Sequence, residues 1–215
     1  MDVADSALEC QRDALRETVY RVLQGVFREP PSSSLLEQLE RECLFEELSK
    51  ESELVFGRSI GGLTLMQSGA RPDLAEALRL EYAKLFVGPD KLEAPPWESV
   101  YRSPDRLVMQ KPALEVLERY LEAGLGYDGI TSCPPDHVAR ELDFMASLIS
   151  RSRSGELDPA RSASMQREFA AAHLCSWLPS FARDVTRAAT LPYFLGAAEL
   201  LADFTALESI ALGAS

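Results

Sequence analysis

The hydrophobic residues of this chain recur every three or four positions, which is the spacing of one face of an α-helix. The pattern predicts a first helix that ends before Pro30-Pro31 and a second that follows Ser32–Ser34, whose hydroxyls can cap it. It breaks from residue 57 to residue 69, where Gly61-Gly62 favours a loop or one irregular turn. The apolar face of the first predicted helix consists of Leu8, Leu15, Val19, Val22 and Val26.

The middle of the chain alternates predicted helices with proline-rich segments. Pro72 suits the first position of a helix that Gly88-Pro89 ends. Residues 88–111 contain four prolines and no helical period, so we expect a long ordered loop there. Pro112 then opens a helix that Gly124 closes. The apolar face expected for this helix is Leu114, Leu117 and Leu121.

The C-terminal third is also helical by its pattern. Asp136 is expected to cap one helix, and Asp158-Pro159 starts another that Pro179 interrupts. The final helix, from residue 192 to about 212, is apolar on several sides, which predicts a buried position. We expect an N-terminal part, residues 1–127, and a C-terminal part, residues 136–215, joined by a hinge loop at residues 128–135.

Composition supports an all-α fold and excludes some functions. Leucine occurs 32 times, whereas valine and isoleucine, which favour strands, occur 15 times together. The net charge of −12 makes a nucleic-acid partner unfavourable. The longest stretch without Asp, Glu, Lys or Arg has 14 residues, short of the roughly 20 that span a bilayer, so we expect no stable membrane insertion. The acidic N-terminus differs from an export signal, and we expect a cytoplasmic protein.

Few residues have the spacing of a catalytic or metal site. His137 and Glu141 lie four residues apart, on one helical face, where they could pair or bind a metal if a further ligand were present. The chain has neither a nucleophile elbow nor a phosphate-binding loop, so we expect no enzymatic activity and no cofactor. Four scattered cysteines are expected to be reduced and mostly in the core: Cys10, Cys43, Cys133 and Cys175.

Residues 85–89 and 94–101 combine prolines with large apolar side chains at high density. Core packing accounts for part of this density. Prolines also hold a groove open, and the neighbouring aromatic residues can anchor an apolar peptide. The segments therefore favour a peptide-binding groove.

These segments together resemble the TorD/DmsD family of cytoplasmic maturation chaperones for redox enzymes. The motifs are EYAKLFVGP at 81–89, PPWESVY at 95–101, PDH at 135–137 and ELDFM at 141–145, with a weaker match at 169–181. The resemblance implies an all-α fold of roughly a dozen helices in two packed parts. It also implies binding of the twin-arginine signal peptide and the catalytic subunit of a molybdopterin-containing oxidoreductase, before export, by a monomer or homodimer.

The resemblance further implies which residues contact the peptide. Some members carry tryptophan where this chain has Tyr82, Asp90 and Tyr101, which predicts a more polar groove and a different client. A buried or exposed acid would pair with a leader arginine, with Asp136, Glu98 and Glu141 as alternatives. Rival functions are a guanine-nucleotide-binding switch or enzyme, with weak GTP binding, and a structural helical subunit of a reductase complex. The expected peptide-contacting residues are Tyr82, Leu85, Phe86, Pro95, Pro96, Trp97, Tyr101, Asp136, His137 and Glu141.

Overall fold

The computed structural model describes residues 3–89, 91–126 and 133–214, and these residues form eleven α-helices with short 3-10 and π-helical turns. Their one β feature is an isolated antiparallel bridge between Trp97 and His137. The predicted all-α class is confirmed, with a helix number close to the dozen expected. Within the described ranges, no helix is both long enough and apolar enough to cross a membrane. The helices are α1 (Val3–Arg28), α2 (Ser33–Glu42), α3 (Leu44–Phe56), α4 (Leu63–Gly69), α5 (Ala75–Tyr82), α6 (Glu98–Arg102), α7 (Lys111–Glu122), α8 (Val138–Arg153), α9 (Pro159–Phe169), α10 (Cys175–Ala188) and α11 (Pro192–Leu212).

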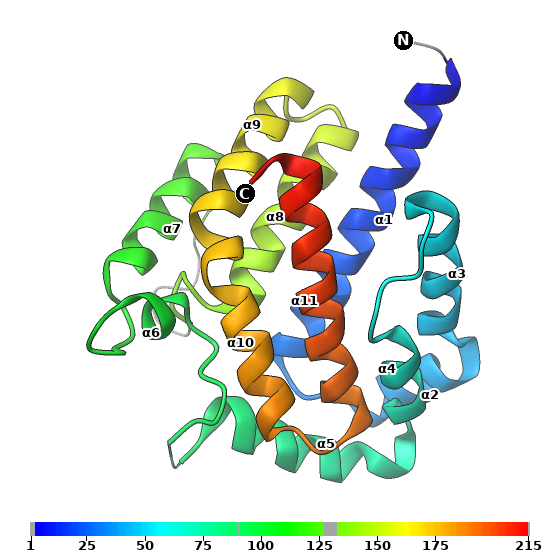
Figure 1. The fold of residues 1–215 in the computed structure, drawn as a ribbon, viewed down its shortest axis with the longest axis vertical. Helices are drawn as coiled ribbons and strands as arrows, with labels where there is room; N and C mark the ends of the chain where they lie inside the picture. The colour runs from blue at the N-terminus through cyan, green and yellow to red at the C-terminus, as the bar shows by residue number, and fades with distance from the viewer. Residues whose placement is uncertain (1–2, 90, 127–132, 215) are drawn as a thin grey trace.

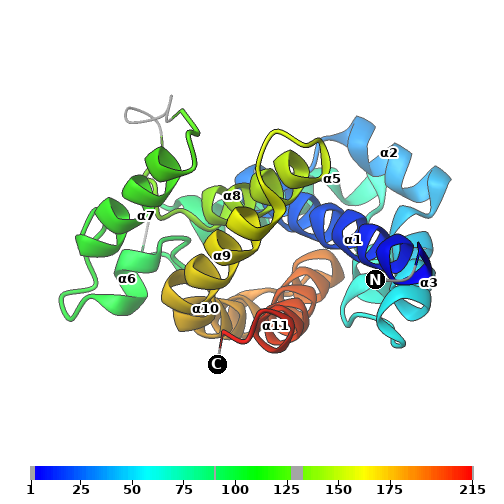
Figure 2. The same ribbon diagram turned by 90° about the horizontal axis from the view of Figure 1, so that it is seen from above.

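The longest helices run side by side through the middle of the molecule (Figure 1). Helix α1 packs along α8, and α11 packs between α10 and α4. Figure 2 shows α6 and α7 at one edge, and α2 and α3 at the opposite edge. The predicted burial of the final helix is confirmed, since α11 contributes ten buried residues. One hydrophobic core contains buried residues from both sides of the predicted hinge at residues 128–135. The division of the chain into two parts at this hinge stays a prediction. Residues 127–132 lie outside the described residues, as does Asp90.

Helix α4 contacts α11 through the backbone, and glycines make this contact possible. A Cβ atom on Gly62 would lie 2.1 Å from the carbonyl oxygen of Gly196, and one on Gly196 would lie 2.6 Å from the amide nitrogen of Met66. Gly62 also has a φ of +86° and precedes the first residue of α4. The loop predicted for residues 57–69 is therefore wrong from Leu63 onward, because Gly61-Gly62 allows close helix packing as well as a break in the chain.

Two other predictions about helices need correction. Leu114 and Leu121 were expected on the buried face of α7, but both are exposed, because α7 packs through Pro112, Ala113, Val116 and Tyr120. Pro179 does not interrupt the helical run, because it lies inside α10. Burial of Trp177 and Phe181 on either side of it offsets the hydrogen bond that proline cannot donate.

The cysteines also differ from expectation. All four are free thiols. However, Cys10 is exposed and the other three are only partly buried, so the expectation of mostly core positions is wrong. Leucine and aromatic side chains fill the core instead.

The glycine contact gives a stability prediction. Gly196→Ala should lower the free energy of unfolding by about 2–3 kcal/mol or more, because the new methyl group collides with the backbone of α4. Gly25→Ala is the matched control, since Gly25 lies within α1 and a Cβ there has no neighbour within 4 Å. The control should stabilise the protein by about 0.5–1 kcal/mol. Thermal unfolding of both variants checks this, and equal melting temperatures would contradict the close approach of α4 to α11.

Candidate functional site

Two of the motifs found in the sequence lie against each other through their backbones. The amide of Glu98 donates to the carbonyl of Asp136, and the amide of Val138 donates to the carbonyl of Pro96, both at 2.9 Å. These reciprocal bonds form the bridge between Trp97 and His137, whose rings meet edge to face at 6.0 Å. The loop before α6 is thus fixed to the start of α8.

The side chains at this bridge cap the two helices that begin there. Asp136 Oδ2 accepts a hydrogen bond of 2.8 Å from the amide of Ser99, in the first turn of α6. His137 is the N-cap of α8, because its Nδ1 accepts from the amide of Ala139 at 3.2 Å. The prediction that Asp136 caps the helix after it is therefore wrong. Asp136 caps a helix that lies 37 residues away in the sequence.

Below the bridge lies a cluster of buried polar side chains centred on Glu98. The Glu98 carboxylate is fully buried, and it accepts from Arg102 Nη1 at 2.5 Å and contacts His173 Nδ1 at 2.9 Å. Ser176 Oγ lies 3.4 Å from the same carboxylate. The weaker motif at residues 169–181 thus contributes His173 to the support of α6, and Glu98 already has several partners.

Glu141 is the second fully buried glutamate of this cluster. Burial raises its pKa well above the usual value, and the nearby Glu98 charge raises it further. Its Oε2 accepts a hydrogen bond of 2.9 Å from the indole nitrogen of Trp177. Glu141 therefore keeps its proton to a higher pH than an exposed glutamate does.

Burial also shifts the pKa values of the two capping residues, Asp136 and His137. The pKa of Asp136 is raised by burial, against the opposing effect of its bonds to Ser99. The pKa of His137 is lowered to about 4, mainly by burial and also by the charge of Arg140. His137 is thus neutral at physiological pH, which its role as a hydrogen-bond acceptor requires. Within the described ranges, no three His, Cys, Asp or Glu side chains lie together in a way that could hold a metal ion.

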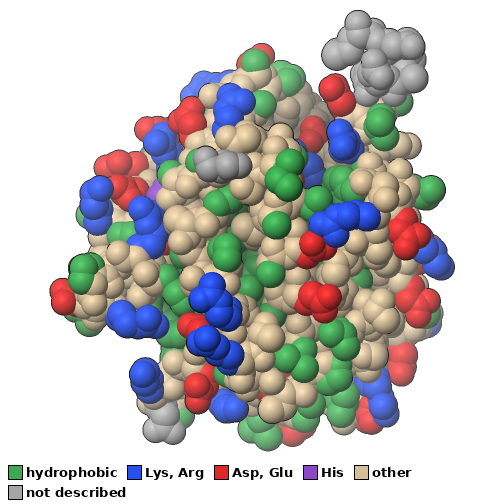
Figure 3. All heavy atoms as spheres, in the orientation of Figure 1, with side chains coloured by type: hydrophobic (Ala, Val, Ile, Leu, Met, Phe, Trp, Pro, Cys, Tyr) green, Lys and Arg blue, Asp and Glu red, His purple; other side chains and the backbone are tan. Residues whose placement is uncertain are grey.

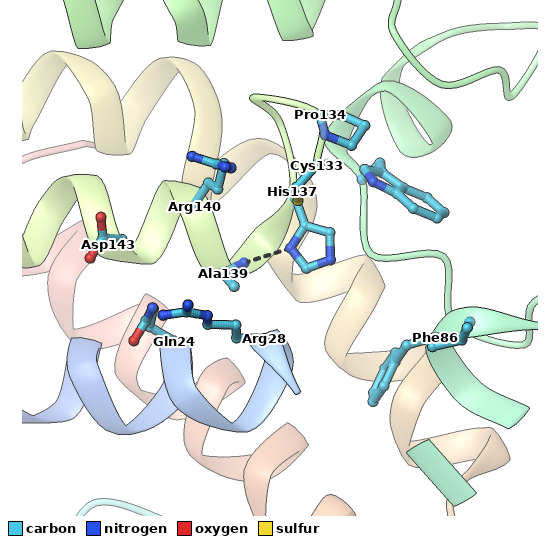
Figure 4. Close-up of a pocket in the computed structure, with 11 residues that line it drawn as sticks. Gln24, Arg28, Phe86, Cys133, Pro134, His137, Ala139, Arg140 and Asp143 are labelled. Atoms are coloured by element: carbon cyan, nitrogen blue, oxygen red, sulfur yellow. Dashed lines mark hydrogen bonds between the residues drawn. The ribbon is translucent and has the colours of Figure 1, made fainter. Parts of the chain in front are cut away.

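A pocket of about 580 Å³ opens beside the bridge, between α1, the start of α8 and the segment after α5 (Figure 4). Phe86, Val87 and Trp97 supply its apolar wall. Gln24 and Arg28 reach it from α1, and Figure 4 shows them opposite Phe86. The full set of lining residues is Gln24, Arg28, Phe86, Val87, Trp97, Cys133, Pro134, His137, Ala139, Arg140 and Asp143.

The charged residues of the pocket are mainly basic. Arg28 and Arg140 both line it, and the one acid among its described lining residues, Asp143, pairs with Arg21 of α1. Phe86 and Val87 give the pocket an apolar surface that an apolar segment can contact.

Of the predicted peptide-contacting residues, Phe86, Trp97 and His137 line the pocket together. The remaining seven do not line it. Tyr82 and Leu85 are in the core, where the Tyr82 hydroxyl donates to the carbonyl of Phe27. Three of the others are buried and two are partly buried: Pro96, Asp136 and Glu141, and Pro95 and Tyr101, respectively.

The structure adds pocket residues that the sequence motifs did not indicate. Gln24 and Arg28 lie one helical turn apart on α1, but polar residues with this spacing also occur on any solvated helix face. Arg140 and Asp143 lie within the motif region without having been singled out. The sequence shows these polar positions on α1, but only the packing of α1 along α8 shows that they lie at the pocket.

The raised pKa of Glu141 can be tested through the pH dependence of stability. A carboxyl whose pKa is raised on folding stabilises the fold below its unfolded pKa, and this contribution is lost as the pH rises through its folded pKa. Glu141→Gln mimics the protonated carboxyl. The variant should melt close to the wild type at about pH 5 and several degrees higher at about pH 9.

The control for this experiment is Glu53→Gln, at an exposed position of α3. It should not change the pH dependence. The contribution of His137, which is lost as the pH falls from about 6.5 towards about 4, is common to all three proteins and cancels in the comparison. A melting-temperature difference between Glu141→Gln and wild type that is the same at both pH values would contradict a raised pKa for Glu141 in the folded protein.

A family model and curated proteins match this chain, and they point to the same family. A family model described as "Nitrate reductase delta subunit" matches residues 56–183, more than half of the chain. A chaperone protein TorD from Vibrio parahaemolyticus is 33% identical over 141 residues, which is 65% of this chain and 66% of that protein, just under two thirds of its length. A chaperone protein TorD from Aliivibrio salmonicida is 27% identical over 198 residues, or 90% of this chain and 92% of that protein.

A solved structure shows the same fold. It is a crystal structure described as a candidate redox enzyme maturation protein from Archaeoglobus fulgidus, with 22% sequence identity and a TM-score of 0.53. The match covers 86% of this chain and 91% of that one. The family model, the curated relatives and the fold agree, and the chain therefore belongs to the nitrate reductase delta subunit family, with TorD chaperones among its relatives, as its central motifs indicated.

Proposed function

We propose that this protein is a maturation chaperone that binds the twin-arginine leader of a molybdopterin-containing oxidoreductase. It holds the catalytic subunit in the cytoplasm until the cofactor has been inserted and export can follow. The family membership and the TorD relatives support the chaperone role. The observation that carries the leader-binding step is the pocket, because it brings Phe86, Trp97 and His137 together from separate motifs.

The pocket suits the apolar middle of a leader peptide. Val87 lines it and is 66% exposed, so its side chain is available to a ligand without any rearrangement. Phe86 and Trp97 extend the same apolar wall. A leader that covers Val87 and the exposed part of Trp97 gains the free energy of burying them, about 25 cal/mol for each Å² of apolar surface.

The basic start of the leader must bind outside the three acidic residues that the motifs contain. Glu98, Asp136 and Glu141 are fully buried, and Glu98 is already paired with Arg102 and His173. A leader arginine reaches none of these acids in this conformation. We infer that the leader arginines lie outside the pocket and are attracted by the overall charge of −12.

The charged side chains on the surface are spread out, which favours long-range attraction of the leader over a single ion pair with it. Figure 3 shows acidic and basic side chains interspersed over the face that carries α10 and α11. Long-range attraction of this kind raises the association rate and weakens with salt. The guanine-nucleotide and structural-subunit alternatives stay predictions, and they differ from the chaperone in binding no leader peptide.

Leader binding is tested with a synthetic leader peptide and Val87→Ser. Loss of the two valine methyl groups from the contact should weaken binding about tenfold, while the fold remains intact because Val87 is exposed. Isothermal titration of the full-length protein gives the dissociation constants. Phe86 is a poorer target, because it is buried against Phe27, Phe181 and Phe194, and its truncation would disturb the core.

The matched control is Leu54→Ser, at a site on α3 that is 83% exposed and outside the pocket. It should bind the leader as wild type does. If Val87→Ser and Leu54→Ser bind equally well, the pocket is not the leader site. If wild-type protein binds no leader from any molybdoenzyme of its host, the proposed function itself is wrong.

For the wild type, leader affinity should also fall as salt rises from about 0.05 M to about 0.5 M, because exposed charges are screened over about 8 Å at 0.15 M. The effect of Val87→Ser should be the same at both salt concentrations, since it removes an apolar contact. A salt-independent affinity would contradict steering of the leader by the acidic chain.

A further inference from the structure

A second pocket, of about 390 Å³, lies across α1 from the pocket at Phe86 and Trp97, which we call the leader pocket. Figure 2 shows α1 between α8 on one side and α2 and α3 on the other, and the two pockets lie at these two junctions. The lining of the second pocket is mostly apolar. We name it the α1–α2 pocket, and its lining residues are Arg21, Val22, Gly25, Val26, Glu29, Pro30, Pro31, Ser32, Leu35, Leu39, Phe45 and Tyr193.

The charge that the α1–α2 pocket offers to a ligand is negative. Arg21 and Glu29 are the charged residues among its described lining residues. Arg21 pairs with Asp143 of α8, so its charge is already neutralised. Glu29 is exposed directly after the end of α1, and no described residue forms an ion pair or a hydrogen bond with its carboxylate. The pocket therefore combines an apolar surface with one acid that has no basic partner.

A narrow strip of the α1 surface separates the two pockets. At about 100° per residue, Gly25 lies between Arg28, which lines the leader pocket, and Glu29, which lines the α1–α2 pocket. Gly25 has no side chain, and a Cβ atom on it would meet no atom within 4 Å. The ion pair of Arg21 with Asp143 also joins the linings of the two pockets. A peptide in the leader pocket can therefore continue over Gly25 into the α1–α2 pocket.

We propose that the α1–α2 pocket binds the arginines of the leader peptide whose apolar middle occupies the leader pocket. This inference rests on the proposed function, and it adds the acid that pairs with the basic part of the leader. An arginine side chain has an apolar stem and a planar charged head. The stem fits against Val22 and Leu35, and the head can donate two parallel hydrogen bonds to the Glu29 carboxylate.

The charges of the two pockets match the two parts of such a leader. In the leader pocket the acid Asp143 is paired, and Arg28 and Arg140 add positive charge, so this pocket suits the apolar part. The α1–α2 pocket has the acid without a basic partner, so it suits the basic part. An uncharged or acidic segment fits the α1–α2 pocket less well, because it leaves Glu29 without a positive counterpart.

Isothermal titration with two synthetic leaders tests the pairing. One leader carries both arginines, and the other has glutamine in their place. Glu29→Gln should weaken binding of the arginine leader about fivefold, as expected for an exposed ion pair, and should not change binding of the glutamine leader. Glu53→Gln, which removes the same charge from an exposed position of α3, is the control. It should weaken the arginine leader less than about twofold, because it acts only through the overall charge.

A larger side chain at Gly25 tests the path over α1. Leucine favours a helix, and this exposed position has open space, so Gly25→Leu should be at least as stable as wild type. Its side chain blocks the path and should weaken binding of the arginine leader about tenfold. Gly25→Ala adds one methyl group and should bind almost as wild type does. Thermal unfolding checks the fold of both variants.

Equal effects of Glu29→Gln and Glu53→Gln would overturn the inference, and so would wild-type affinity in Gly25→Leu. A Glu29→Gln variant that weakens both leaders to the same degree would also overturn it, because Glu29 would then not pair with the arginines. If Val87→Ser still weakens binding in any of these cases, the inference fails and the proposed function stands. If wild type binds neither leader, the proposed function fails together with the inference.

Discussion

Two backbone hydrogen bonds between the loop before α6 and the start of α8 determine where the candidate site lies. They join segments that are about forty residues apart in the sequence, and they set Trp97 against His137. The side chain of Asp136 strengthens this junction by capping α6. A cap of this kind contributes about 1 kcal/mol, so the junction is fixed by several modest interactions that act together. The pocket forms where this junction meets α1 and Phe86.

The polar cluster beneath the junction explains why acidic motif residues need not contact the leader. A buried carboxylate is costly unless it is paired, and Glu98 is paired with Arg102 and His173. Burial raises the pKa of Glu141, which favours its uncharged form, and its Oε2 accepts a hydrogen bond from Trp177. These groups connect α6, α8 and α10, and they leave the apolar wall of the pocket open to the proposed leader peptide. The motif residues thus divide into those that hold the site and those that line it.

The all-α class and most helices could be predicted from the spacing of apolar residues. The prediction failed where packing decides the outcome. Gly61-Gly62 has the local pattern of a turn, but Gly62 allows the close contact with Gly196, which is distant in the sequence. The leucines of α7 have the spacing of an apolar face, yet Leu114 and Leu121 are exposed in the structure. The spacing of leucines predicts that a helix face is apolar, but it does not predict whether that face is buried.

Only part of the candidate site could be predicted from the sequence. The motifs indicated Phe86, Trp97 and His137, because aromatic residues beside prolines mark a groove. They could not indicate that Asp136 caps a helix 37 residues away, since its local sequence fits the cap of the next helix equally well. Gln24 and Arg28 of α1 were also beyond prediction, because they join the site only through the packing of α1 along α8.

The central claim is that the leader binds in the pocket between α1, the segment after α5 and the start of α8. Hydrogen–deuterium exchange of the protein, with and without a saturating twin-arginine leader peptide, tests it most directly, because exchange reports local opening along the whole backbone. The account predicts slower exchange in peptides that cover residues 21–28, 84–98 and 134–143, with little change in α3. Slower exchange confined to α3, or to residues 103–122, would contradict it.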